Sequence, residues 1–244
     1  MNEQGVSAIV RKLSAFVVLT QEEQSVVDGL CRHPRLIRAG HDLVVQGQTR
    51  HSAYILQSGW VCSYKLQEDG SRQIIDFQVP GDFLGLRSVL LRTSDHSFES
   101  VTDIQVSEVQ TADLIAAFEC APRLSAAIFW AVSRDEAMVV EHLVGVGRRG
   151  ADSRVAHFLL ELETRLALIG LSNRRCFRCP LTQYHLADAL GLSAVHVNRV
   201  LRHLREAGLV TFRHGFVSIH DPIALADIAG FDATYLDQAE PLLR

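Results

Sequence analysis

The polar residues best suited to selective chemistry lie close together in the last third of the chain. Arg199 carries a planar guanidinium that can form two parallel hydrogen bonds with guanine, and the carboxamide of Asn198 suits adenine. The guanidiniums of Arg202, Arg205 and Arg213 are suited to holding phosphate groups. Side chains of these types in this order are typical of a surface that contacts both the bases and the backbone of DNA.

Two short helices are expected to position these groups. Thr182 can cap a helix that continues to Leu190, and Ser193 can cap a second helix over Ala194–Ala207. Gly191 lies at the turn, where a residue free to adopt a positive φ is needed. This spacing predicts a helix-turn-helix, in which the second helix enters the major groove. The alternative is an ordinary helical hairpin with solvated polar residues.

The apolar and polar residues of this segment separate onto different faces. The expected inner face consists of Leu186, Ala187, Leu192, Val197 and Leu201. The residues left largely on the other faces are His196, Asn198, Arg199, Arg202 and His203. This separation is what an exposed recognition helix needs.

Glycines and helical periods predict the surrounding elements. Gly145–Gly150 interrupts the helical pattern and is the best candidate for a domain boundary. Beyond it, Ser153–Leu168 is expected to form an amphipathic helix. Val210–Ile219 is expected to form a hairpin that turns at His214 and Gly215.

The first 120 residues have a different period. Leu13–Leu30 is expected to be helical, with Thr20 as a capping residue. Short apolar runs separated by glycines then predict strands, and the segment Glu68–Ser71 predicts a hairpin turn. Many short strands at this spacing indicate a barrel or jelly roll. The expected strands are Leu36–Arg38, Leu43–Gln46, Ala53–Gln57, Val61–Leu66, Gln73–Val79 and Ile104–Gln110.

A long helix is expected to follow, from Pro122 to about Val146. Its apolar residues recur every three, four or seven positions, at Leu124, Ile128, Val132, Val139, Leu143 and Val146. Such a stripe packs either against the helix's own domain or against a second copy in a coiled-coil-like seam. Periodicity alone leaves both interpretations open.

Composition limits the class of protein. The chain has 244 residues and a formal net charge of −4, which argues against a protein that coats nucleic acid over its whole surface. Neither a signal peptide over Met1–Lys12 nor a membrane-length apolar run is evident. Five scattered cysteines fit reduced thiols, so a cytoplasmic location is expected.

Motifs of the common enzyme classes do not occur in the sequence. We find no GxSxG, Walker loop, glycine-rich dinucleotide turn or zinc-protease motif, so an enzyme is not expected. The eleven histidines form no compact HxxxH or HExxH set, and we expect them at the surface or at helix caps. No metal site is therefore expected.

Several segments together resemble the Crp/Fnr superfamily of bacterial regulators. They are Gly81–Gly85, Asp152–Ala156 and Pro180–Leu204, and Leu186–Arg199 is especially similar to the FixK-related branch. The resemblance implies an α+β fold with three parts: a cyclic-nucleotide-binding-like β jelly roll (1–120), a long dimerisation helix (121–147) and a winged helix-turn-helix (148–244).

The resemblance also implies roles for residues of the helix-turn-helix. Asn198 and Arg199 fall at base-contacting positions, whereas Ser193 and His196 fall near the phosphates or the groove edge. Thr182 and Gln183 fall where the family contacts the DNA backbone.

Val195 departs from the family pattern. It occupies a position where several members carry a base-contacting Glu. Valine cannot accept a hydrogen bond from cytosine, although it can contact a thymine methyl group. The half-site sequence therefore does not follow from the resemblance.

The expected effector pocket lacks the groups that cyclic AMP needs. Members that bind it use a carboxylate for the ribose and an Arg-Ser pair for the phosphate, but this chain has Leu86, after Gly85, and His96-Ser97 at those positions. A buried phosphate needs charged partners. The resemblance thus implies a degenerate pocket and no control by cyclic AMP, and it leaves another effector open.

No cofactor is expected either. Oxygen-sensing members hold an iron–sulfur cluster through cysteines near the N-terminus, but here no cysteine precedes Cys31. Cys176 and Cys179 have CxxC spacing, so a redox or metal-binding pair is an alternative. If this segment is extended, the two side chains point to opposite faces.

The favoured hypothesis is a regulator that binds a palindromic site in double-stranded DNA as a homodimer, with RNA polymerase as a further partner and no membrane contact. The alternative is a cyclic-nucleotide-like module that binds a small ligand and regulates a partner protein. The altered pocket and the helix-turn-helix both argue against this alternative.

Overall fold

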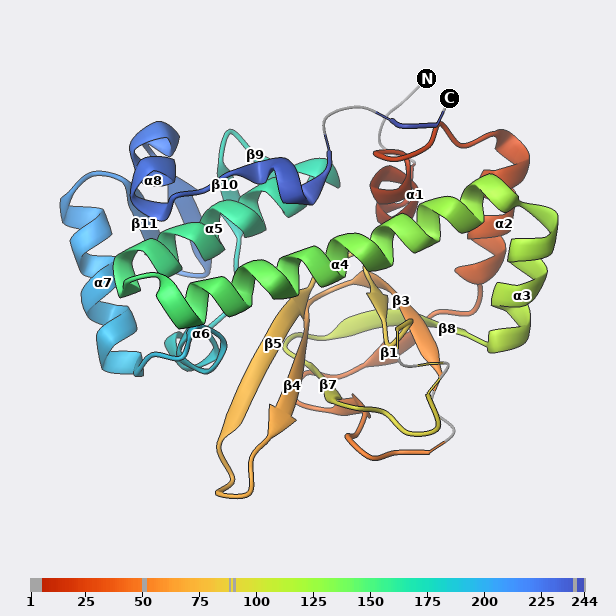
Figure 1. Ribbon diagram of the computed structural model, residues 1–244, viewed down its shortest axis with the longest axis horizontal. Coiled ribbons are helices and arrows are strands. Elements are labelled where there is room, and N and C mark those ends of the chain that lie inside the picture. Colours follow the sequence, from red (N-terminus) through yellow and green to blue (C-terminus); the bar gives the residue numbers. More distant parts are fainter. Residues whose placement is uncertain (1–5, 50–51, 88, 90, 239–240, 244) are drawn as a thin grey trace. The chain divides into compact units, whose positions relative to one another are not determined.

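The computed structural model describes residues 6–49, 52–87, 89, 91–238 and 241–243 (Figure 1). The chain divides into two compact units. Unit 1 comprises 1–65, 76–136 and 237–244, and unit 2 comprises 66–75 and 137–236. Met1–Gly5, part of the segment tested for a signal peptide, lies outside the described residues.

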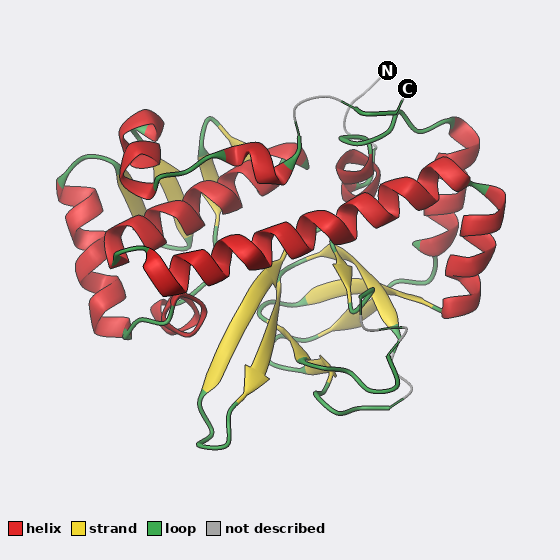
Figure 2. Cartoon of the chain, viewed as in Figure 1, coloured by secondary structure: helices red, strands yellow, loops and turns green. Residues whose placement is uncertain are grey.

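Two four-stranded sheets form the β portion of the first 120 residues, as the sequence predicts for a jelly roll (Figure 2). Their strand orders are β1-β8-β3-β6 and β2-β7-β4-β5. The strands are β1 (Arg35–Ile37), β2 (Asp42–Val44), β3 (Ala53–Ser58), β4 (Val61–Leu66), β5 (Arg72–Gln78), β6 (Phe83–Leu84), β7 (Ser97–Ser100) and β8 (Ile104–Val109). The six predicted strands are confirmed within two residues, and β6 and β7 were not predicted. β7 was not predicted because its buried residues include two serines, so apolar and polar residues do not alternate along it.

The N-terminal helical segment differs from the prediction. Instead of one helix over Leu13–Leu30, the chain forms α1 (Ala8–Leu13) and α2 (Gln21–Leu30). Thr20 caps α2 as expected, and its extended backbone explains why no helix continues through it. A further helix, α3 (Thr111–Cys120), was not predicted.

The long helix is confirmed as α4 (Pro122–Arg148). It continues through Gly145 and Gly147, so the break in the helical pattern lies nearer Gly150, the N-cap of α5 (Ala151–Leu168). Two residues of the predicted stripe, Leu124 and Ile128, are only 0% and 2% exposed within a core cluster of unit 1. The first half of α4 therefore packs on its own unit.

The C-terminal part of unit 2 contains the predicted helix-turn-helix and hairpin. Its helices are α5, α6 (Gln183–Leu190), α7 (Ala194–Glu206), α8 (Pro222–Ala229) and the 3-10 helix η2 (Ala233–Leu236). Its sheet has the order β11-β12-β10-β9, with β9 (Ser172–Asn173), β10 (Cys176–Arg178), β11 (Val210–Arg213) and β12 (Phe216–Ile219). His214 and Gly215 both have positive φ, which confirms the predicted hairpin turn. None of the described helices is long and apolar enough to cross a membrane.

Candidate DNA-binding interface

The helix-turn-helix is capped at the expected residues. The backbone N–H of His185 donates to Thr182 Oγ1 at 3.3 Å, and the N–H of His196 donates to Ser193 Oγ at 3.2 Å. Gly191 ends α6 with φ of 62°, a left-handed conformation that an L side chain rarely adopts. These local signals fix where α6 ends and where α7 begins.

Arg154 stabilises the turn between α6 and α7 through hydrogen bonds to backbone carbonyl groups, a role that was not predicted from the sequence. Its guanidinium donates to the carbonyl oxygens of Leu190 at 2.5 Å, Val146 at 3.1 Å and Arg149 at 3.0 Å. One side chain therefore joins the end of α6 to the carboxyl end of α4 and to the segment after it. The signal that the sequence offered for Arg154 was its position in the segment Asp152–Ala156, one of the segments on which the family resemblance rests.

The buried face of α7 is shifted from the predicted one. Val197 is buried as expected, but Val200 and Leu204 complete the face, whereas Leu201 is only half-buried. The opposite face presents Val195, which is 79% exposed. Asn198, Arg199, Arg202 and Arg213 are also exposed, and His196 is half-buried. The polar face predicted for α7 therefore faces solvent.

The structure brings two of the predicted site residues together. The amide group of Asn198 donates to the side-chain oxygen of Gln183, which joins the first turn of α6 to the exposed face of α7. Asn198 retains its own oxygen and one amide hydrogen for a ligand. Gln183 thus orients Asn198, and a change at either residue should affect both.

Three exposed residues beside this surface were not predicted from the sequence: Tyr184, Arg178 and Phe216. Tyr184, in the first turn of α6, is 72% exposed. On the neighbouring sheet, Arg178 and Arg213 each pair with Phe216 of β12, which is 50% exposed. Alternation along β10 was the available signal, because Phe177 faces the core and Arg178 therefore faces outward.

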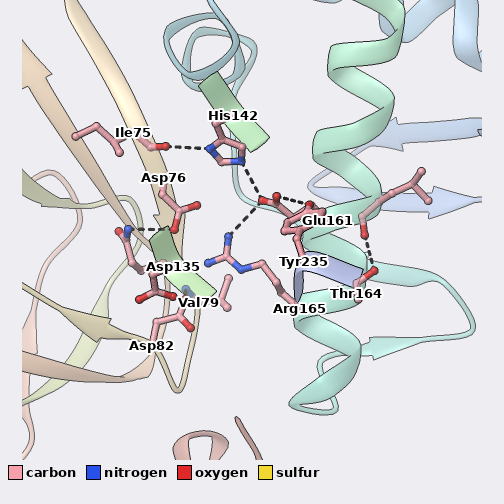
Figure 3. Close-up of polar contacts among 12 residues, drawn as sticks. Ile75, Asp76, Val79, Asp82, Asp135, His142, Glu161, Thr164, Arg165 and Tyr235 are labelled. Atoms are coloured by element: carbon pink, nitrogen blue, oxygen red, sulfur yellow. Dashed lines mark hydrogen bonds and ion pairs between the residues drawn. The ribbon is translucent and has the colours of Figure 1, made fainter. Parts of the chain in front are cut away.

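A buried polar network lies in unit 2 (Figure 3). The carboxylate of Glu161 on α5 accepts hydrogen bonds from Tyr235 at 2.6 Å and from His142 at 3.0 Å. Burial raises the pKa of Glu161, but His142, Arg165 and the hydrogen bonds outweigh burial and lower the pKa to about 2. The buried carboxylate is therefore charged and joins α4, α5 and η2.

Two histidines of unit 2, His142 and His157, depart from the prediction that histidines lie at surfaces or caps. His157 is buried, and burial together with nearby Arg149 lowers its pKa to about 4 despite Glu161 and Glu141. His142 is partly buried, and its Nδ1 lies 3.1 Å from the carbonyl oxygen of Ile75. A single sequence shows the spacing of histidines but not the tertiary contacts that bury them.

The residues of the expected effector pocket lie in unit 1 and have partners within the protein. Leu86 packs against a core cluster, and Ser97 Oγ accepts from the backbone N–H of Gln46 at 2.9 Å. His96 Nδ1 lies 2.7 Å from Asp95 Oδ1. Burial lowers the pKa of His96 although Asp95 opposes the shift, so at neutral pH this ring supplies no cation for a phosphate.

The CxxC segment separates its two thiols. Cys176 on β10 is exposed, whereas Cys179 is buried, and burial raises its pKa to about 12. The alternation of exposed and buried residues places the two side chains on opposite faces. In this structure both cysteines are free thiols.

Comparison with known proteins identifies the family. A Crp-like helix-turn-helix domain model matches residues 153–228, and a cyclic nucleotide-binding domain model matches residues 34–119. The nitrogen fixation regulation protein FixK of Bradyrhizobium diazoefficiens is 34% identical over 73% of this chain and 74% of its own length. The chain belongs to the Crp/Fnr family.

Other members of the Crp/Fnr family support the same fold and class. The fumarate and nitrate reduction regulatory protein of Escherichia coli is 24% identical over 91% of this chain and 88% of its own length. The solved structure of FixK2 from Bradyrhizobium japonicum matches with a TM-score of 0.73 and 26% identity, over 82% of this chain and 98% of that one. The protein is therefore a DNA-binding transcription regulator of the Crp/Fnr type.

Proposed function

We propose that this regulator binds an inverted-repeat DNA site as a homodimer through α7 and that cyclic AMP does not control it. The exposed face of α7 carries the proposal. Arg199 and Asn198 supply base contacts, and Val195 offers only an apolar contact such as a thymine methyl group. We assign the backbone contacts to Thr182, Gln183, Ser193, His196, Arg202 and Arg213.

The proposed dimer contact is the exposed face of α4. Phe129 and Leu143 are 73% and 72% exposed, and Val140 is exposed between them. Phe129, Val140 and Leu143 have the spacing of a coiled-coil seam, in which Glu136 occupies the position between Phe129 and Val140. This seam replaces the stripe through Leu124 and Ile128, because those side chains are already buried.

The insensitivity to cyclic AMP rests on the side chains that occupy its expected contacts. Gly85 is followed by Leu86, an aliphatic residue, and His96 and Ser97 have partners within the protein. Calorimetry with cyclic AMP should therefore show no saturable binding that changes affinity for DNA. Tight binding coupled to operator affinity would contradict this assignment.

The functional division that we propose follows the family architecture: a sensor-like jelly roll (1–120), a dimerisation helix (121–147) and a winged helix-turn-helix (148–244). RNA polymerase is the proposed protein partner, as expected for a transcription regulator that occupies promoter DNA. The cytoplasm is the proposed location, because the proposed ligand is bacterial DNA.

The direct test of the proposed function is a binding selection on random duplexes, followed by gel shifts. The wild-type protein should select an inverted repeat with half-site centres about 34–36 Å apart. Arg199→Ala should lose about 1–3 kcal/mol and relax the preference at one base position in each half-site. If Arg199→Ala keeps both the affinity and the sequence preference, the assignment of α7 as the recognition helix is wrong.

A further inference from the structure

The last described residues of the chain return to unit 1 and pack there. Leu243 pairs with Val17 in a parallel bridge: its N–H donates to the carbonyl oxygen of Phe16, and its carbonyl oxygen accepts from the N–H of Val18, both at 3.1 Å. The side chain of Leu243 is half-buried against a core cluster of unit 1. Figure 1 shows this segment, in blue, beside the red segment that follows α1. The chain is therefore anchored to unit 1 at Leu243.

Asp237 provides a second anchor in unit 1. Its Oδ2 accepts a hydrogen bond from the indole Nε1 of Trp130 at 2.8 Å. Trp130 is only 7% exposed, and its ring stacks on Phe16, whose carbonyl oxygen takes part in the first anchor. Both anchors therefore meet at one part of unit 1. Asp237 and Leu243 are thus the two ends of a C-terminal strap, residues 237–243.

The residues just before the C-terminal strap are anchored in unit 2. Tyr235 donates to Glu161 at 2.6 Å, and its ring stacks on that of His157. Two residues later, Asp237 is bonded to Trp130 of unit 1. Two residues of chain span at most about 7 Å. Unit 2 can therefore move only slightly before one of these two bonds must break.

The C-terminal strap differs from the other connections between the units. The chain passes from one unit to the other at four places. Three of them lie inside continuous elements, namely β4, β5 and α4. The fourth follows Leu236, where the connection depends on the two anchors of the strap. Asp237 also has φ of 46°, a left-handed conformation that is unfavourable for a residue other than glycine. The strap is therefore the connection that can be released while both units stay folded.

We propose that the C-terminal strap restrains unit 2 and thereby sets how strictly the protein selects the spacing between two half-sites. This inference rests on the proposed function, because it concerns the binding of an inverted repeat by a homodimer. One added base pair moves a half-site by about 3.4 Å along the duplex and turns it by about 35°. A restrained unit 2 cannot follow that displacement, so a wrong spacing costs affinity. A released strap lets α7 follow it at a smaller cost.

Leu243 and Leu242 provide a matched pair of variants. Leu243→Ala removes a side chain that packs on unit 1, whereas the side chain of Leu242 is 75% exposed. Both changes remove the same atoms from neighbouring residues. Amide hydrogen exchange at Val18 reports the docking of the strap, because this N–H donates to Leu243. Leu243→Ala should accelerate the exchange several-fold, and Leu242→Ala should leave it unchanged.

The DNA experiment compares the selected inverted repeat with duplexes whose half-sites are one base pair closer together or further apart. The wild-type protein should bind the altered duplexes about tenfold more weakly, a penalty comparable to that of one mismatched base pair. Leu243→Ala should reduce this penalty to about threefold, which is half of it in free energy. Leu242→Ala should keep the full penalty.

Trp130→Phe tests the other anchor of the strap. It keeps an aromatic ring against Phe16 but removes the N–H that donates to Asp237. It should reduce the spacing penalty as Leu243→Ala does, although it changes a different residue of unit 1.

Three results would overturn the inference. The first is unchanged exchange at Val18 in Leu243→Ala, and the second is faster exchange together with the full spacing penalty. The third is an equal gain in affinity at every spacing, since the strap would then inhibit DNA binding instead of restraining unit 2. Failure of the proposed function is a separate result: the wild-type protein would select no inverted repeat.

Discussion

In unit 1 the ammonium group of Lys12 is buried, and it lies 2.9 Å from Asp82 Oδ1. The guanidiniums of Arg199 and Arg202 on α7, in contrast, are exposed to solvent. Asp135 lies 3.6 Å from the same ammonium group. Among the described residues, Arg199 and Arg202 form no ion pair. One region uses its charges to hold elements of the protein together, and the other leaves them available for a ligand.

The same contrast separates the expected effector pocket from the DNA-binding surface. His96 and Ser97 are buried and have partners on Asp95 and Gln46. Arg178, Phe216 and Arg213, in contrast, are exposed to solvent. A polar residue predicted from family position is therefore a good candidate for ligand binding only when the fold leaves its hydrogen-bonding groups unused.

The largest effect should come from breaking the buried ion pair of unit 1. Asp82→Asn keeps the shape of the side chain but removes the nearer of the two carboxylates beside Lys12. Only Asp135, which is partly exposed and 3.6 Å away, then compensates the buried ammonium. Such a loss costs about 3 kcal/mol of the free energy of unfolding. Urea denaturation of both proteins measures it.

Asp103→Asn is the matched control for that change. Asp103 also pairs with a cation, Arg38, but both side chains are largely exposed and solvent screens the pair. Its free energy of unfolding should change far less than that of Asp82→Asn. Equal losses in the two variants would show that burial does not distinguish the two kinds of charge in this protein.

Local signals made much of the fold predictable. Thr182, Gly191 and Ser193 act through hydrogen bonds and backbone angles within a few residues, so the sequence places α6 and α7 correctly. His214 and Gly215 likewise fix the β11–β12 turn. The periodicity of the apolar residues likewise predicted α4, α5 and six strands of the jelly roll.

Features that depend on distant contacts were not predictable. Arg154 holds the turn through the carbonyl groups of Leu190, at the end of α6, and of Val146 and Arg149, around the end of α4, and no local pattern shows such bonds. Leu124 and Ile128 follow a period that suits either a partner helix or a core, and only the packing shows that they are buried. The position of Phe216 between Arg178 and Arg213 follows from the register of three strands, which one sequence does not contain.

An effect of similar total size, but spread over several pH units, should follow acidification through His157 in unit 2. The folded protein lowers the pKa of His157 from its ordinary value of 6.5 to about 4. Between these values the unfolded chain binds the proton and the folded chain does not, so stability is lost as pH falls through this window. The total loss is up to about 3 kcal/mol, and most of it is spread below pH 6.

His157→Phe isolates that contribution. The ring packs against Phe231 and Tyr235, so phenylalanine fits the same apolar contacts without a titrating group. Its free energy of unfolding should fall less steeply between pH 6.5 and 4 than that of the wild type, whereas Glu161 contributes only below about pH 4.5. Parallel stability curves for the two proteins would rule out His157 as the titrating group.

The smallest of these effects on folding, but a clear one on assembly, should come from the exposed face of α4. Leu143→Glu places a charge in the proposed seam, where its desolvation opposes association. Because Leu143 is exposed in the single chain, the variant should keep its unfolding midpoint at concentrations where both proteins are monomeric. Its dimer dissociation constant should rise at least tenfold, about 1.4 kcal/mol, as measured by sedimentation equilibrium. Ile128→Glu is the contrasting change, because Ile128 is in the core of unit 1 and should unfold that unit instead. If the wild type sediments as a monomer at micromolar concentration, or if Leu143→Glu dimerises as tightly as the wild type, this face of α4 is not the seam.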